Sequence, residues 1–215
     1  KLQKAIKLNQ MEKSNNLSRR KFLGITSAAA GFVILSKSDS LAAESSFQSA
    51  GKPDSRFGGV QVGAITYSWR SMPVSPADII KYCKQTGISS IELMGDVAER
   101  YAGIPEGKDG SEERRNWRLS APIEKYRELR TMFNNAGIKI HITKFSPAGW
   151  SEPEIDYSFK AAKALGSIGV CNEIGDEACK KMGPIAKSNG MYAIFHNHLQ
   201  PGEPGWTFEK FLDYS

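Results

Sequence analysis

The strongest constraint on the fold is a repeat in which a strand pattern is followed by a helix pattern. Five short apolar or alternating runs indicate strands, and capping serines, prolines and closing glycines mark helices between them. The predicted strands are residues 60–67, 90–94, 138–143, 168–173 and 191–196. The predicted helices are residues 75–87, 120–137, 151–166, 176–190 and 208–214. This alternation predicts an α/β fold with a parallel sheet and helical crossovers.

Two architectures fit this alternation, an open doubly wound sheet and a (β/α)8 TIM barrel. The first turn after a strand, residues 67–71, lacks the G-x-G-x-x-G pattern of dinucleotide-binding sheets. In the third strand His141 and Thr143 fall on one face and the isoleucines on the other, as in a barrel strand with a polar lumen side. We therefore predict a (β/α)8 TIM barrel.

A complete barrel takes about 250 residues, and this chain shows five strand–helix units. We expect residues 59–215 to be the N-terminal portion of such a barrel, with only the first five βα units. Two explanations stay open. The chain is either a truncated product or a shortened domain that pairs with another chain to cover its open strand edges, and a homo-oligomer would be one form of such pairing.

The N-terminal segment has the pattern of an export signal. Arg19 and Arg20 in S-R-R-K-F-L precede an apolar stretch at residues 24–35, and small residues follow at 40–43. These are the parts of a signal peptide, and the paired arginines indicate the twin-arginine route. The apolar stretch has about twelve residues, whereas a membrane-spanning helix needs about 20, so an uncleaved anchor is disfavoured.

These features divide the chain into three parts. Residues 1–43 are predicted to be a twin-arginine signal peptide, in which residues 1–10, before Met11, form an upstream extension. Residues 44–58 are rich in Ser, Gly and Pro and predict a flexible linker. We expect export by the twin-arginine translocase, and therefore a periplasmic or otherwise exported location.

The net positive charge of the chain comes from residues 1–43. The sequence has 29 Lys and Arg and 23 Asp and Glu; residues 1–43 contain 8 and 2 of these, which leaves 21 of each in residues 44–215. A domain of zero net charge lacks the excess of Lys and Arg that binds the phosphates of nucleic acids, so we predict no nucleic acid partner. The three cysteines lack zinc-like spacing and are expected to be free and buried, with a Cys171–Cys179 disulfide as the alternative.

Polar residues collect at the ends of the predicted strands, where barrel active sites lie. His196 and His198 are two positions apart and therefore share a face, and Glu173 ends the preceding strand. Two imidazoles and a carboxylate can hold a divalent metal, or act as acid and base. We predict Glu173 and His196 as catalytic residues and metal ligands. Substrate contacts are predicted at Trp69, Glu92, His141, Lys144 and His198.

Each of these residues also has a structural interpretation. Glu92 could belong to a salt bridge or a cap, because a carboxylate between apolar neighbours needs a partner or a water-filled pocket. His141 could be a lumen residue satisfied by a neighbour, and Lys144 a solvated loop residue. One histidine of the pair could serve only as a hydrogen-bonding residue.

Four segments resemble the xylose-isomerase-like TIM-barrel family, the sugar phosphate isomerase/epimerase group, many of whose exported members carry twin-arginine signals. They are residues 87–96 (GISSIELMGD), 134–145 (NNAGIKIHITKF), 161–198 and 204–215. Residues 161–198 are the most specific of the four segments. The resemblance covers residue 59 to the end. It implies a site for Mn²⁺, Mg²⁺, Co²⁺ or Zn²⁺, and isomerisation or epimerisation of a sugar or sugar phosphate by proton transfer beside a carbonyl.

The sequence departs from this family pattern in two respects. Many epimerases of the group end the fifth strand with a glutamate ligand, and His196 stands there in this chain. The remaining ligands are expected on strands six to eight, after Ser215, so the metal site within this chain is incomplete.

We therefore expect an exported metal-dependent sugar (phosphate) isomerase or epimerase. A carbohydrate-binding barrel without catalysis is one alternative, supported by the missing acidic residue at position 196 and by tryptophans near loops at positions 69, 150 and 206. An inactive truncated fragment is the other.

Overall fold

The structure is a computed structural model that describes residues 51–199, 202, 204 and 206–212. The predicted signal peptide, its upstream extension and residues 44–50 of the predicted linker lie outside the described residues. No helix in the described part of the chain combines the length and the apolar character that crossing a membrane requires.

The centre of the fold is a five-stranded parallel sheet. Its strands, in spatial order, are β3 (Ala64–Ile65), β4 (Ser90–Met94), β5 (Lys139–Lys144), β6 (Gly169–Glu173) and β7 (Tyr192–His196). Spatial order therefore equals sequence order. Doubly wound sheets reverse direction at a switch point, and the described strands show no such reversal; their order is that of a barrel, which grows one neighbouring strand at a time. The α/β prediction is confirmed; closure into eight strands stays a prediction.

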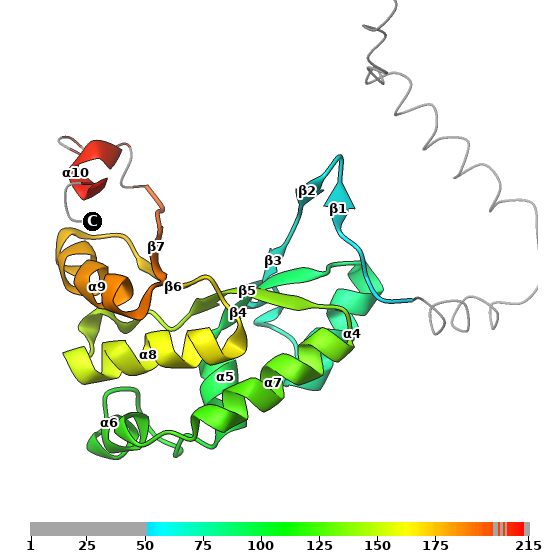
Figure 1. Cartoon of the computed structure of the whole chain (residues 1–215), viewed down its shortest axis with the longest axis horizontal. Coiled ribbons are helices and arrows are strands. Elements are labelled where there is room, and N and C mark those ends of the chain that lie inside the picture. Colours follow the sequence, from blue (N-terminus) through cyan, green and yellow to red (C-terminus); the bar gives the residue numbers. More distant parts are fainter. Residues whose placement is uncertain (1–50, 200–201, 203, 205, 213–215) are drawn as a thin grey trace, which may run out of the picture. The chain divides into compact units, whose positions relative to one another are not determined.

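Helices connect the strands and cover one side of the sheet. They are α4 (Pro76–Thr86), α5 (Gly95–Ala102), α6 (Glu112–Leu119), α7 (Ile123–Asn135), α8 (Glu152–Leu165), α9 (Asp176–Asn189) and α10 (Phe208–Leu212), with short 3-10 turns η2 (Thr66–Trp69) and η3 (Pro147–Gly149). In Figure 1, α4, α5, α7 and α8 all lie below the strands, while no helix covers the space above the sheet between β7 and β3. One-sided coverage is the arrangement of a barrel wall, whose other face is the lumen.

The predicted helix boundaries at α4 and α8 are confirmed by their caps. Ser75 and Asp78 form a reciprocal capping box at the start of α4, and Ser151 and Glu154 form another at the start of α8. Both helices end at a glycine in the left-handed region, and Gly166 after α8 has a φ of 80°.

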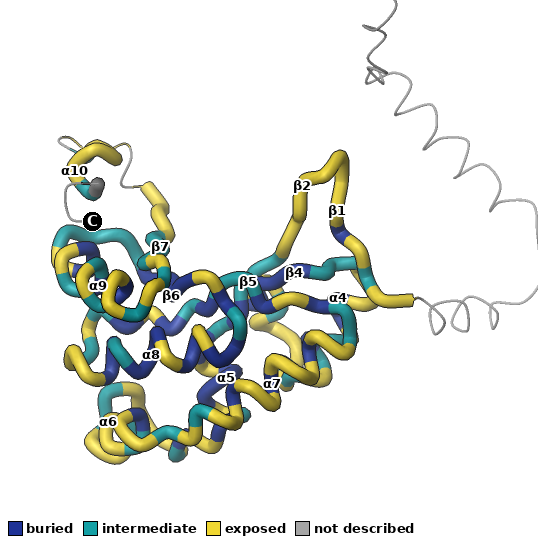
Figure 2. The backbone as a smooth tube through the Cα atoms, in the orientation of Figure 1, coloured by how far each residue is buried: buried dark blue, intermediate teal, exposed yellow. Residues whose placement is uncertain are grey.

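The core lies between the sheet and these helices. The side chains of Ile91 and Leu93 from β4 are fully buried there against Leu129, Phe133 and Phe159 of the helices. Each such side chain contributes about 1.5–3 kcal/mol by burial. Figure 2 shows that burial concentrates where α5, α7 and α8 adjoin the strands. All three cysteines are buried and free, as predicted.

The first predicted strand, residues 60–67, is divided in two. Val60–Gln61 forms β2, which pairs antiparallel with β1 (Arg56–Phe57) in a separate hairpin, and only Ala64–Ile65 joins the main sheet. The predicted linker at 44–58 therefore ends in a hairpin. At Gly63 the chain passes from the hairpin to the main sheet and runs close to the backbone of Ser90. A Cβ at this position would lie 2.9 Å from the Ser90 carbonyl oxygen, so glycine is needed there.

The pairing of β4 with β5 is irregular, and this changes which side chains of β5 share a face of the sheet. Ile91 pairs with Ile140, but Glu92 pairs with Ile142, so His141 is an extra residue in the register. Thr143 consequently lies beside Leu93 on the helix side, where its hydroxyl is 2.6 Å from the Ser167 hydroxyl. The expectation that His141 and Thr143 share a face was wrong. Lys144 is instead placed on the face of Glu92.

The charged segment after β4 folds around a buried arginine. Arg118 has a side chain only 1% exposed and makes ion pairs with Glu99, Asp109 and Glu154. Its guanidinium also lies 3.6 Å from the centroid of the Trp150 ring. Because these partners come from α5, the loop before α6, and the start of α8, the arginine joins three elements at one point.

Candidate metal centre

The centre begins with two residues that end neighbouring strands. Glu173 is the last residue of β6, His196 is the last residue of β7, and the two are register partners. Residues paired in this way point to the same face of a parallel sheet, and the carboxyl ends of the strands form the functional rim of a barrel. The sheet register therefore brings together the two residues predicted as metal ligands.

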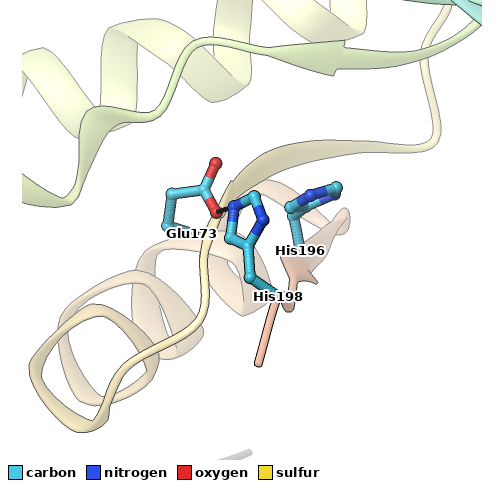
Figure 3. A group of neighbouring side chains, drawn as sticks. All are labelled: Glu173, His196 and His198. Carbon is cyan, nitrogen blue, oxygen red and sulfur yellow. Dashed lines mark hydrogen bonds and ion pairs between the residues drawn. The ribbon is translucent and has the colours of Figure 1, made fainter. Parts of the chain in front are cut away.

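His198, in the loop after β7, completes a compact group with these two residues. One potential ligand atom from each of Glu173, His196 and His198 lies within 4.8 Å of the others. The Nε2 atom of His198 is 2.9 Å from Oε2 of Glu173, and the two imidazole rings are 4.6 Å apart, tilted by 69°. Figure 3 shows the His198 ring turned back toward the carboxylate, beside His196.

Lys144 is the fourth member of the group. Its Nζ atom donates to Oε1 of Glu173 over 2.5 Å, and its side chain is 11% exposed, whereas that of Glu173 is 45% exposed. Partial burial would raise the pKa of Glu173, but the hydrogen bond and charge of Lys144, with smaller effects from His196 and His198, hold this pKa below its usual value. The carboxylate is therefore ionised at neutral pH, the form that binds metals.

The chemistry of these donors fits a divalent metal. Imidazole nitrogens and carboxylate oxygens bind Zn²⁺ at about 2.0–2.2 Å, so ligands of one ion lie no more than about 4.4 Å apart, and a small rotation brings this group into that range. Two nitrogens and one oxygen suit Zn²⁺, Co²⁺ or Mn²⁺ better than Mg²⁺, which prefers oxygen ligands. Lys144 is a competing cation on the same carboxylate.

Two of the predicted substrate contacts line a neighbouring hollow. Glu92 and His141 lie in its wall, and its volume is about 340 Å³. The Oε1 atom of Glu92 is buried and has no hydrogen-bond partner among the residues that the structure describes.

Trp69, the remaining predicted substrate contact, is placed elsewhere. Its ring packs against the core and lies 5.7 Å from the ring of Tyr82 in α4. The structure therefore does not bring Trp69 into the group around Glu173, and a substrate contact there stays a prediction.

Two further residues of β6 support the site. The buried Asn172 accepts a hydrogen bond from the Ala148 amide over 3.0 Å and donates to the Glu173 carbonyl over 2.7 Å, which fixes the loop after β5 against the end of β6. Cys171 lies beside Glu92, and burial together with the charge of Glu92 raises the pKa of this thiol to about 12. Cys171 was predictable from the alternation of side chains along β6, because it shares a face with Glu173.

Comparisons with known proteins give similarities at low sequence identity. No family model and no curated protein matches the chain. A sugar phosphate isomerase/epimerase from Parabacteroides distasonis is 19% identical with a TM-score of 0.44, and covers 75% of this chain and 64% of its own. The probable 3-DHS dehydratase AsbF of Bacillus anthracis, involved in petrobactin synthesis, is 15% identical with a TM-score of 0.46, and covers 72% of this chain and 58% of its own.

An uncharacterized protein from Parabacteroides distasonis is 18% identical with a TM-score of 0.45, and covers 68% of this chain and 59% of its own. The chain thus spans less than two thirds of the length of each of these three proteins. The parallel sheet and its one-sided helices, rather than these similarities, define the fold of the chain as α/β.

Proposed function

We propose that this chain carries part of the active site of a metal-dependent isomerase or epimerase that acts on a sugar or sugar phosphate. The observation that carries the proposal is the group of Glu173, His196 and His198, whose ligand atoms lie within 4.8 Å of one another at the carboxyl ends of two parallel strands. Active sites of βα barrels lie at this rim.

The residues of the group have distinct roles in this proposal. Glu173, His196 and His198 would hold the metal, which when bound polarises the carbonyl and hydroxyl oxygens of a sugar. Where only one of His196 and His198 ligates the metal, the other imidazole would serve the proton transfer beside the carbonyl. Lys144 keeps Glu173 ionised and offers an ammonium group to a sugar oxygen or a phosphate.

The proposal extends to the whole protein. Three donors leave open coordination positions for substrate or for further ligands, and we propose that a complete (β/α)8 barrel supplies the latter from strands that follow the first five. We also propose that the protein is exported by the twin-arginine translocase. Replacing Arg19 and Arg20 by lysine should leave the protein in the cytoplasm, and unchanged export would contradict this part.

Metal binding is the first test. Titration with Zn²⁺, Co²⁺ and Mn²⁺, followed by calorimetry, should show a saturable site that Glu173→Gln or His196→Asn weakens at least tenfold. His141→Asn is the matched control, because His141 is the one remaining histidine of the sequence and lies outside the group. Equal affinities in all four proteins would contradict the assignment of the site.

Proton exchange is the second test. With metal present, the protein should exchange the proton next to the carbonyl of a ketose or aldose in D₂O, and Glu173→Gln should abolish the exchange. Saturable sugar binding without exchange and without metal would favour the carbohydrate-binding alternative instead.

A further inference from the structure

The hollow beside the metal centre has an unusual wall. Its polar side is formed by Gln61, Ser90, Glu92 and His141, and the rest is apolar and comes from β3, β4 and β5. We name it the Glu92 hollow. Its volume of about 340 Å³ falls within the usual range for small-molecule sites, about 300–1,000 Å³.

The carboxylate of Glu92 adjoins the Cys171 thiol, and one of its two oxygens is left without a hydrogen bond in the described part of the fold. It caps no helix and forms no ion pair there, and its Oε1 atom is buried without a hydrogen-bond partner. Its strand neighbours Ile91 and Leu93 belong to the core on the opposite face. A buried carboxylate oxygen without a donor costs folding free energy, and such a cost is typical of residues kept for binding.

The Glu92 hollow and the metal centre share one face of the sheet. Glu92 pairs with Ile142, and Lys144 lies two residues further along β5, which corresponds to about 7 Å. Cys171 lies two residues before Glu173 in β6 and shares its face.

We propose that the Glu92 hollow is a subsite for the hydroxyl groups of a polyol chain, in which Glu92 Oε1 accepts a hydrogen bond and His141 and Gln61 offer further polar contacts. This inference rests on the proposed function for its substrate, because the subsite would hold the end of the sugar that does not react. Binding at the subsite itself requires no metal.

The wall of the hollow favours a hydroxylated ligand over a cation. Ca²⁺ and Mg²⁺ take six or more oxygen ligands and Zn²⁺ usually has at least three protein ligands, whereas the hollow offers one carboxylate and one imidazole among mainly apolar neighbours. A hydroxyl group matches it better, because each hydroxyl donates one hydrogen bond and accepts others. The Gln61 amide nitrogen already donates to Ser55, Val62 and Ser89, so the hydroxyls would chiefly supply the donor that Glu92 Oε1 lacks.

Polyol binding without metal tests the inference. Xylitol and sorbitol are titrated in EDTA and followed by saturation-transfer NMR, with wild type, Glu92→Gln and the control Glu113→Gln, whose side chain is exposed. We expect saturable binding in wild type and in the control, and at least tenfold weaker binding in Glu92→Gln. We also expect Glu92→Gln to melt at a higher temperature, because a neutral amide oxygen costs less than a carboxylate oxygen where no donor is present.

The outcomes separate this inference from the proposed function. Glu173→Gln should lose metal binding but keep its affinity for xylitol in EDTA, so the subsite can exist even where the isomerase proposal fails. Equal xylitol affinity of wild type and Glu92→Gln would overturn the subsite, even if metal binding and proton exchange are found. A lower melting temperature of Glu92→Gln without a change in binding, or methylammonium binding in place of the polyols, would also overturn it.

Discussion

Gly169, the first residue of β6, sets how closely β6 and β7 approach. A Cβ at this position would collide with the carbonyl oxygen of Tyr192 and would lie 2.9 Å from Cδ1 of Ile194. The carbonyl belongs to the backbone of β7 and cannot rotate away. The same two strands align Glu173 with His196, so the absence of one side chain at Gly169 supports the geometry of the metal centre.

We expect Gly169→Ala to destabilise the protein by about 1–3 kcal/mol, the usual cost of overpacking. Urea unfolding measures this loss, and the affinity for Zn²⁺ should fall with it because the strand ends shift. Gly149→Ala is the matched control, since a Cβ there meets no atom within 4 Å. Equal free energies of unfolding for the two variants would contradict this prediction, because they would show that β7 moves away from the added Cβ without a loss of stability.

Single residues of the centre were predictable only in part. The two-residue spacing of His196 and His198 was sufficient to place both near Glu173, because strand periodicity is local. The ion pair of Lys144 with Glu173 was not predicted, because it depends on the extra residue in β5, and one inserted residue reverses the faces of everything after it.

At the scale of elements, Arg118 links the segment that follows β4 to α8 through ion pairs. It joins Glu99 of α5 to Glu154 of α8 across distances of 2.8 and 3.2 Å, within a nearly solvent-free environment. Buried ion pairs repay their desolvation only when every partner is satisfied. Loss of the arginine would therefore leave carboxylates buried without a counter-charge.

Arg118→Met keeps an unbranched apolar stem and removes the guanidinium group with its charge, so we expect a loss of about 3–5 kcal/mol in the free energy of unfolding. Arg100→Met is the control, because Arg100 and Asp96 form an exposed pair on α5, and such pairs contribute about 0.3–0.5 kcal/mol. Chemical denaturation of both variants decides the matter. A loss below about 1 kcal/mol for Arg118→Met would mean that the network adds little to stability.

The same network predicts the effect of acid. Burial alone would raise the pKa of Glu154, but hydrogen bonds from Ser151 and Arg118 hold it below its usual value. In that range the unfolded chain binds a proton that the folded chain does not, so stability is present above about pH 4.3 and is lost as pH falls toward the lower folded pKa. Denaturation curves recorded between about pH 3 and pH 7 should show a weaker pH dependence for Glu154→Gln than for wild type; parallel curves would contradict this origin.

The elements differ in how far the sequence could predict them. Helices with strong local signals, such as the Ser75 and Ser151 capping boxes, were predicted close to their observed limits. The segment of α5 and α6 was not, because its buried arginine pairs with Glu99, 19 positions earlier, and with Glu154 of α8, 36 positions later, and neither pairing is visible in the local sequence. The hairpin of β1 and β2 was likewise missed, since its pairing requires a turn at Gly58 and Gly59 rather than a continuous strand.

At the scale of the whole molecule, the sheet ends in an edge. Within the described residues β7 pairs only with β6, and its outer side offers backbone groups without a strand partner. Tyr192 on this strand is 68% exposed, and Leu199 and Phe208, further along the chain, are exposed as well. Free edges with apolar side chains promote pairing with another chain, as expected for the alternative in which a second chain covers the open strand edges.

We expect the purified chain to associate as its concentration rises, through the edge of β7. Tyr192→Lys should reduce this association, because a charged side chain on an edge strand disfavours pairing, and sedimentation velocity over a range of concentrations measures the effect. Tyr67→Lys is the control, since Tyr67 is also an exposed tyrosine but belongs to η2 at the opposite end of the sheet. If the lysine at position 67 reduced association as much as the lysine at position 192, general surface charge would be responsible and the edge of β7 would not be the interface.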